Sequence, residues 1–294
     1  MRYANEVMRA LMLLVATVMA AHVFAGCAST TTVPVTFMSV TPTSPQEITG
    51  VMVRPAGNGP FPAVVQLHGC AGVEATSYRW ARWFADHGYV ALVVDSFTTR
   101  AVRPDCRSSP DEPPLTARLD DAFGGLRYLQ SLPFVRGDRI AAIGWSQGAV
   151  YALAVINGPS LDRARKRGVS IPDAGFAAAI GFYPDCHSLI PEQVIRPLLV
   201  LIGSADDWTL AVKCEQMATA MRSRGADVTL VVYPGAYHYF DVEGQQREVL
   251  AGVENDNTPT GHGATVSYQA AAAKDASVQV ERFLARHLTH GPSR

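Results

Sequence analysis

Short, continuous apolar runs recur along most of the chain. Six of them cover residues 61–69, 89–97, 139–144, 176–184, 196–203 and 226–235, and a seventh, residues 47–55, alternates apolar with polar positions. Continuous runs of this kind are typical of strands buried on both faces of a sheet, whereas alternation is typical of a strand with one exposed face. The pattern therefore predicts a sheet whose inner strands are covered on both sides.

Between these runs, apolar residues fall at helical spacing. Trp80, Trp83 and Phe84 share one face of the segment 77–88, which ends at a glycine. Further helices are predicted around residues 119–126, 147–156, 211–225 and 270–288. Alternating strands and helices predict an α/β fold, in which a mostly parallel central sheet carries helices on both faces. The pattern shows no internal repeat and predicts one domain over residues 46–290.

Two segments fall outside this alternation. Residues 27–45 are rich in Ser, Thr and Pro and predict a tether that leads into the first edge strand. Residues 240–266 are rich in Gly, Asn and Thr and are interpreted as part of a lid or as a surface loop.

The N-terminus resembles an export signal. Arg2 and Arg9 precede an apolar run over residues 11–25, which is short for a membrane span of about 20 residues. Residues 1–26 are therefore predicted to be a signal peptide, cut after Ala25 or, in the lipoprotein form, before a lipid-modified Cys27. The first form predicts a soluble periplasmic protein, and the second predicts attachment to the bacterial outer membrane through the lipid. An uncleaved anchor is the alternative, and all of these forms leave the cytoplasm.

The cysteine count agrees with export. The chain has five cysteines, and setting Cys27 aside for lipid leaves an even number in an oxidising compartment. We expect the pairs Cys70–Cys106 and Cys186–Cys214, because each would join loops at the same end of the sheet. Four buried thiols are the alternative. Neither Cys nor His occurs at a chelating spacing, so no metal site is predicted.

The amino-acid composition limits the classes of partner that the protein is expected to bind. Of 294 residues, 48% are hydrophobic and 17% are charged, with a formal net charge of −1. This is a globular composition, and it lacks the basic runs that would favour binding to nucleic acid.

One short motif lies where a predicted strand turns into a predicted helix. In "GWSQG", Ser146 stands between Gly144 and Gly148. A serine on such a sharp turn is held above the sheet in a sparsely populated backbone conformation, and the crowded strand and helix require small neighbours. The positive end of the following helix would also favour negative charge there. Ser146 is therefore predicted to be a nucleophile.

A serine needs a base, and the base needs an orienting carboxylate. In α/β enzymes with this turn, the order along the chain is Ser, acid, His. His238 follows one predicted strand, and Asp206 and Asp207 follow another. Successive residues point opposite ways, so only one aspartate can reach the histidine. His187 is the rival base, but it precedes both aspartates.

Acyl transfer also needs donors for the oxyanion. We expect one from the backbone N–H of Gln147, directly after the nucleophile. The second is expected from the N–H of Cys70 or Ala71, in a loop that two glycines allow to turn inward. His68 in the same loop is predicted to order it.

Several motifs together resemble the dienelactone hydrolase family, a branch of the α/β-hydrolases. The resemblance covers residues 46–290 and is carried by "HGCAGV", "GYVALVVDSF", "GWSQG", "YPDC", "LIGSADDWT", "YPGAYHYFD" and the late "GHG…YQAAAAKDA…FLARHL". It implies an α/β-hydrolase fold and hydrolysis of a carboxylic ester or lactone without a cofactor. The family's acid lies three residues after the glycine that ends its strand, which implies Asp206.

The chain departs from the family at two positions. The defining enzymes use a cysteine nucleophile and a glutamate that controls it, whereas this chain has Ser146 and, at the other position, Gly69. A thiolate needs pKa control and a serine needs only the histidine, so the two changes agree and favour a general esterase.

The sequence defines the residues of the substrate pocket less closely than the catalytic residues. Trp145 and Trp208 are predicted to form its walls, and Arg100 or Arg103 is a candidate partner for a substrate carboxylate. An amidase or peptidase on the same scaffold, and a non-catalytic binding protein of the cell envelope, remain alternative functions.

Overall fold

The computed structural model describes residues 29–104, 106, 115–187 and 194–289. The predicted signal peptide (1–26) and Cys27 lie outside the described residues, so their assignments stay predictions. Each helix in the described part is too short or too polar to cross a lipid bilayer.

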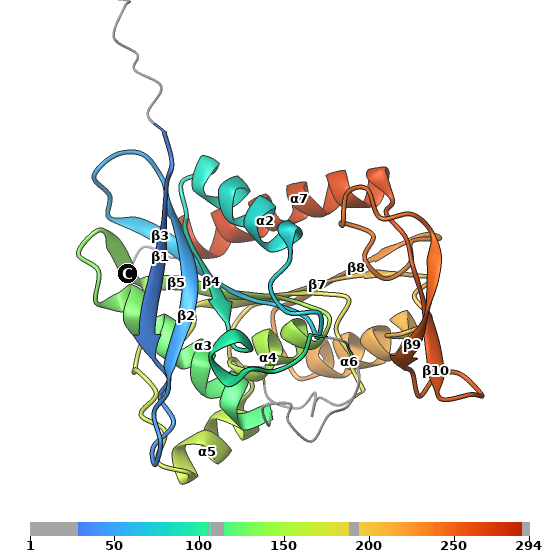
Figure 1. Ribbon diagram of the computed structural model, residues 1–294, viewed down its shortest axis with the longest axis horizontal. Helices are drawn as coiled ribbons and strands as arrows, with labels where there is room; N and C mark the ends of the chain where they lie inside the picture. Colours follow the sequence, from blue (N-terminus) through green and yellow to red (C-terminus); the bar gives the residue numbers. More distant parts are fainter. Residues whose placement is uncertain (1–28, 105, 107–114, 188–193, 290–294) are drawn as a thin grey trace, which may run out of the picture.

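An eight-stranded sheet runs through the centre of the molecule (Figure 1). Its strands are β1 (Thr31–Met38), β2 (Glu47–Arg54), β3 (Phe61–Leu67), β4 (Val90–Asp95), β5 (Val135–Trp145), β6 (Ala178–Phe182), β7 (Leu198–Gly203) and β8 (Val228–Tyr233). Their spatial order is β1-β2-β4-β3-β5-β6-β7-β8. The pairs β1–β2 and β2–β4 are antiparallel, and every later pair is parallel. The carboxyl ends of the parallel strands therefore meet at one edge, where open sheets of this kind bind ligands.

Helices cover both faces of the sheet. They are α2 (Ala75–Asp86), α3 (Leu115–Gln130), α4 (Gln147–Ala154), α5 (Gly158–Lys166), α6 (Ala211–Ser223) and α7 (Ala270–Leu284), with two short helical turns, η2 (Thr98–Arg100) and η4 (Ala285–Thr289). In Figure 1, α2 and α7 lie against one face, and α3, α4 and α6 lie against the other. The predicted α/β architecture, with a mostly parallel sheet between helical layers, is confirmed.

The inner strands explain why this layering is stable. Every residue of β6 and β7 is buried, and Ile180 and Val200 have no exposed surface. Fully burying an aliphatic side chain contributes about 1.5–3 kcal/mol. The continuous apolar runs seen in the sequence are thus the consequence of helices on both sides.

The predicted tether (residues 27–45) is wrong over residues 31–38. Residues 31–38 form β1, which pairs with β2 from Thr31 opposite Arg54 to Met38 opposite Glu47. Phe37 is buried and Val35 is half-buried, so one face of the strand packs on the domain. The many Thr residues hid this alternation, because Thr is common both in tethers and in strands.

A second sheet accounts for the predicted lid or loop. Strands β9 (Glu248–Glu254) and β10 (His262–Val266) form an antiparallel hairpin between β8 and α7. Figure 1 shows it at one end of the molecule, beyond the carboxyl ends of β7 and β8. Five of the seven residues of β9 are exposed, whereas Ala264 and Val266 of β10 are buried.

Candidate active site

Ser146 lies on the sharp turn between β5 and α4. Its φ is 52° and its ψ is −120°, a left-handed conformation that non-glycine residues rarely adopt. A Cβ atom on Gly144 would lie 2.1 Å from the carbonyl oxygen of Gly148, and one on Gly148 would lie 2.1 Å from that of Leu67. Both neighbours must therefore be glycine, which is the steric reason expected from the sequence.

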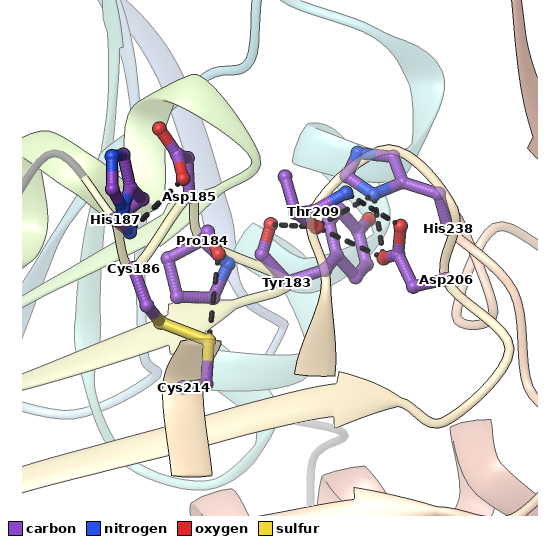
Figure 2. The surroundings of a disulfide bond; sticks show 9 residues. All are labelled: Tyr183, Pro184, Asp185, Cys186, His187, Asp206, Thr209, Cys214 and His238. Atoms are coloured by element: carbon purple, nitrogen blue, oxygen red, sulfur yellow. Dashed lines mark hydrogen bonds and ion pairs between the residues drawn. A yellow bond between two sulfur atoms is a disulfide. The ribbon is translucent and has the colours of Figure 1, made fainter. Parts of the chain in front are cut away.

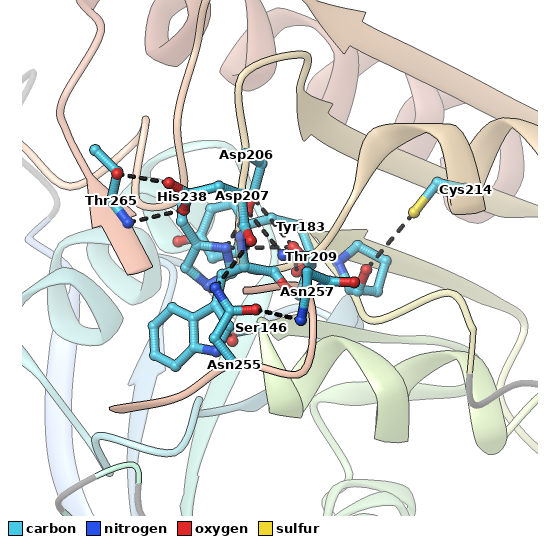
Figure 3. Close-up of polar contacts among 12 residues, drawn as sticks. Ser146, Tyr183, Asp206, Asp207, Thr209, Cys214, His238, Asn255, Asn257 and Thr265 are labelled. Carbon is cyan, nitrogen blue, oxygen red and sulfur yellow. Dashed lines mark hydrogen bonds and ion pairs between the residues drawn. The ribbon is translucent and has the colours of Figure 1, made fainter. Parts of the chain in front are cut away.

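His238 connects the serine with an aspartate (Figure 3). Its Nε2 lies 3.0 Å from Oγ of Ser146, and its Nδ1 lies 2.8 Å from Oδ2 of Asp206. The three side chains come from the ends of β5, β7 and β8, and all three residues are buried. With the Nδ1 proton donated to Asp206, Nε2 is left to accept the hydroxyl proton of Ser146.

The carboxylate of Asp206 is held by further donors. The backbone N–H groups of Trp208 and Thr209 donate to Oδ1 over 3.0 and 2.9 Å. The hydroxyl of Thr209 lies 3.0 Å from Oδ2. These contacts fix the orientation of the acid toward His238. Sequence reasoning missed Thr209, although a Thr three residues after an Asp often makes this contact.

Asp207 points away from His238. Its two oxygens accept the backbone N–H and the hydroxyl of Thr265, on β10. Asn255, at the end of β9, donates to the carbonyl oxygen of Asp207 over 2.9 Å. Successive aspartates thus have different partners, as expected, and Asp207 attaches the hairpin to the end of β7 (Figure 3).

A cavity of about 700 Å³ opens beside Ser146. Its walls come from the loop after β3, the segment after η2, the start of α4, the segment after β6, the start of α6 and the β9–β10 hairpin. Trp208 lines it, as predicted, and the lining includes both cations (Arg103, Lys213) and carboxylates (Asp185, Glu254, Asp256). Within the described residues, His, Cys, Asp and Glu form no cluster of three that could hold a metal ion.

The predicted role of Trp145 in the pocket is wrong. Of the residues that the structure describes, those lining the cavity do not include Trp145. Its indole N–H donates to Oδ2 of Asp241 over 3.0 Å, and its ring is stacked on Phe182 at 5.4 Å. Trp145 is the last residue of β5, so its side chain lies on the opposite face of the strand from the next position, Ser146.

Arg100 also lies outside the described cavity lining. Its two terminal nitrogens each donate to a carboxylate oxygen of Asp121 over 2.8 Å, and one of them also donates to the carbonyl oxygen of Ser96. The side chain of Asp121 is fully buried, so this arginine neutralises an internal charge. Arg103, the other candidate, does line the cavity.

The residues predicted to donate to the oxyanion lie near Ser146. Cys70 and Gln147 line the cavity, whereas Ala71 is not among its described lining residues. A Cβ atom on Gly69 would lie 3.6 Å from the Cβ of Ser146. The loop after β3 therefore passes directly beside the serine, and a larger residue in place of Gly69 would crowd it.

The two other histidines near the site do not contact Ser146 in the described contacts. His68 is buried: Nδ1 lies 2.7 Å from the carbonyl oxygen of Gly69, and Nε2 accepts the N–H of Ser96. Burial, reinforced by the charge of Arg118, lowers the pKa of His68 to about 3. Its contacts order the loop, as predicted. His187 lines the cavity at the segment after β6.

A buried carboxylate that the sequence did not single out lies behind the histidine. Asp241 accepts hydrogen bonds from the indole N–H groups of Trp80 and Trp145 and from the hydroxyl of Tyr183. Burial raises its pKa, and these donors partly offset that effect. The ring of Tyr183 packs 4.3 Å from that of His238. The Asp241 network thus supports the face of the imidazole that Tyr183 contacts.

Both predicted disulfides are present, and one of them lines the cavity. Cys70–Cys106 joins the loop after β3 to the segment after η2, and both cysteines line the cavity. Cys186–Cys214 joins the segment after β6 to the first turn of α6 (Figure 2). The two bonds therefore fix loops at the carboxyl edge of the sheet, as the sequence argument required.

The fold is that of an α/β-hydrolase. A model of the dienelactone hydrolase family matches residues 48–288, so the chain belongs to that family and is a carboxylic ester hydrolase. This confirms the resemblance found in the sequence.

Individual relatives are distant. The chain is 24% identical over 207 residues, 64% of its length and 77% of the relative's, to a probable 2-oxo-3-(5-oxofuran-2-ylidene)propanoate lactonase from Bradyrhizobium sp.. It is 25% identical over 179 residues to esterase FrsA from Shigella boydii, covering 60% of this chain and only 41% of FrsA. Among solved structures, a dienelactone hydrolase-like promiscuous phosphotriesterase, P91, from metagenomic libraries superposes with a TM-score of 0.62 at 20% identity, over 87% of this chain and 98% of P91. That likeness supports the fold.

Proposed function

We propose that the protein hydrolyses small carboxylic esters or lactones through an acyl-enzyme on Ser146. The observation that carries the proposal is the relay Ser146–His238–Asp206, with separations of 3.0 and 2.8 Å, at the wall of a cavity. The strained backbone of Ser146 supports it, because such strain persists where a function requires it.

The steps follow from the geometry. Nε2 of His238 takes the hydroxyl proton as Oγ of Ser146 bonds to the acyl carbon, and the carbonyl electrons move onto oxygen. The N–H groups of Gln147 and Cys70 hold that oxyanion. The proton on His238 then passes to the departing alcohol oxygen, which in a lactone stays attached to the acyl group. Water then bonds to the acyl carbon and gives a proton to Nε2 of His238. As the bond between the acyl carbon and Oγ of Ser146 breaks, His238 returns that proton to Oγ, which releases the acid and restores the free serine. Water is the only co-substrate, so the scheme needs no cofactor.

The cavity and the relatives support small substrates. About 700 Å³ is within the range of small-molecule sites, and Trp208 and Arg103 offer an aromatic wall and a cation. Relatives include a lactonase and an esterase by name. The serine and Gly69, in place of a cysteine and a glutamate, favour esters in general over a single lactone.

Replacing the serine tests the proposal. Ser146→Ala is expected to lower kcat on p-nitrophenyl esters and on a lactone panel by about 10⁴-fold or more. A fluorophosphonate probe is expected to label the wild type and not the variant. Ser223→Ala, an exposed serine on α6, is the matched control and should keep full activity and labelling. Substantial ester hydrolysis by Ser146→Ala would contradict the mechanism.

We further propose that the protein is exported and anchored through lipid on Cys27. The two disulfides support export, because such bonds persist in oxidising compartments. Labelling cells with radioactive palmitate is expected to mark the wild type. Cys27→Ala should be unmarked and move to the soluble periplasmic fraction. A wild type that takes up no label would contradict the anchor.

A further inference from the structure

An arginine is buried on α3, close to the site but outside the serine relay. Arg118 is only 2% exposed. Burying a guanidinium is costly unless polar partners compensate it. Its described contacts therefore indicate what the buried cation does.

The two terminal nitrogens of Arg118 reach different backbone segments. Nη1 donates to the side-chain oxygen of Gln147, and Nη2 donates to the carbonyl oxygen of His68. Gln147 directly follows the nucleophile at the start of α4, and His68 directly follows β3 and leads into Gly69 and Cys70. One rigid guanidinium thus bridges the two segments proposed to supply the oxyanion donors.

Aromatic rings hold the guanidinium in place. Its central carbon lies 4.4 Å from the ring centre of Tyr151 and 5.0 Å from that of Phe97. Cation–π contacts of this kind stabilise a desolvated arginine and restrict its movement. A lysine has no planar fork and would not bind both segments in the same way.

We propose that Arg118 is a positioning residue that sets the separation between the two halves of the oxyanion hole. This inference rests on the proposed serine mechanism. Donors must lie about 2.7–3.1 Å from the oxyanion, and a displacement of about 1 Å can cost about 100-fold in rate. Arg118 acts through the side chain of Gln147 and the backbone of His68 and does not need to touch the substrate.

Two variants of Arg118 test the inference. Arg118→Lys and Arg118→Met are expected to lower kcat by about 10–100-fold with KM changed by less than about threefold. A trifluoromethyl ketone forms a tetrahedral adduct on Ser146 whose oxygen occupies the oxyanion hole. Its affinity should fall by about the same factor as kcat/KM, and inhibition by butyrate should stay unchanged. Arg127→Met, an exposed arginine on the same helix, is the matched control.

A variant at Gln147 tests the same inference even if the Arg118 variants fail to fold. Gln147→Met removes the acceptor of Arg118 and keeps the backbone N–H, so it should reproduce part of the loss. Combined with Arg118→Lys, its effect should be smaller than the product of the single effects, because both remove one interaction.

The outcomes separate the two proposals. If folded Arg118→Lys kept wild-type kcat and ketone affinity, or raised only KM, the positioning role would be overturned and the serine mechanism would stand. If Ser146→Ala, assayed alongside, kept its activity, the serine mechanism would be overturned and the role of Arg118 with it.

Discussion

Thr265 donates both its backbone N–H and its hydroxyl to the carboxylate of Asp207, over 2.8 and 2.6 Å. Asp206, the residue before Asp207, faces His238 instead. The two adjacent carboxylates therefore have different roles. Asp206 orients the imidazole of His238, and Asp207 attaches the β9–β10 hairpin, which forms part of the cavity wall.

Asparagine substitutions should separate these two roles. Asp206→Asn is expected to lower kcat by about 10⁴-fold, because the amide no longer holds the correct tautomer of His238. Asp207→Asn weakens the attachment to Thr265 and should change mainly KM, with kcat within about tenfold of wild type. Steady-state kinetics on p-nitrophenyl esters measures both. Equal losses of kcat in the two variants would contradict the assignment.

Adding one methyl group at the nucleophile turn should destabilise the fold. In Gly148→Ala the new Cβ would lie 2.1 Å from the carbonyl oxygen of Leu67, so the backbone must shift. We expect a loss of about 3 kcal/mol or more in the free energy of unfolding, measured in urea. Gly137→Ala is the control, because its Cβ would come no closer than 3.4 Å to another atom. Similar stabilities for the two variants would refute the steric argument.

His68 should make the protein sensitive to acid. Its pKa is lowered from 6.5 to about 3 in the folded state, chiefly by burial. The unfolded chain binds the proton first, so the stabilising contribution is complete above about pH 6.5 and is lost as the pH falls toward 3. At pH 4.5 the loss from this one group is about 2–3 kcal/mol.

The neutral variant His68→Gln provides the comparison for that effect. Its free energy of unfolding should fall less steeply than that of the wild type between pH 7.5 and 4.5, whatever its absolute stability. Urea unfolding at several pH values gives the two slopes. Parallel slopes would show that His68 does not titrate as its burial implies.

The disulfide between Cys186 and Cys214 should stabilise the protein more than it affects catalysis. It closes a segment with a sequence separation of 28 residues, for which chain entropy gives about 3–4 kcal/mol. The double variant Cys186→Ala/Cys214→Ala should therefore unfold at lower urea concentration, with kcat on p-nitrophenyl esters within about tenfold of wild type. Unfolding midpoints under non-reducing conditions test this. An unchanged midpoint would contradict the expectation.

The sequence predicted the parts of the site that depend on strand ends. Ser146, His238 and the pair Asp206/Asp207 could be placed together because parallel strands end at one edge, and the same argument paired the four cysteines. The choice of Asp206 over Asp207 came from the family resemblance. The continuous apolar runs predicted the sheet, because a strand that is buried on both faces carries apolar side chains at nearly every position.

The missed parts depend on contacts between segments distant in the chain. Arg100 binds Asp121, on a helix whose rotation about its axis the sequence does not reveal. Trp145 precedes the serine directly in the sequence, yet a strand alternates its faces at every residue, so its side chain lies away from the described cavity lining. Arg118 contacts the start of α4 and the end of β3, both distant from α3 in the sequence, and no local pattern marked it.

The residues proposed for catalysis and part of the cavity wall lie on different structural elements, because the β9–β10 hairpin is separate from the central sheet. The groups proposed to break the bond lie at the ends of the central strands, whereas part of the cavity wall is the turn of a hairpin. Strand β10 of that hairpin is joined to the site through Asp207 and through a bridge between Val266 and His238. Loop length has only a small entropic cost. Insertions or deletions in the turn after Asn257, away from the bridge to His238, therefore offer a way to change which esters are accepted while the catalytic residues keep their positions.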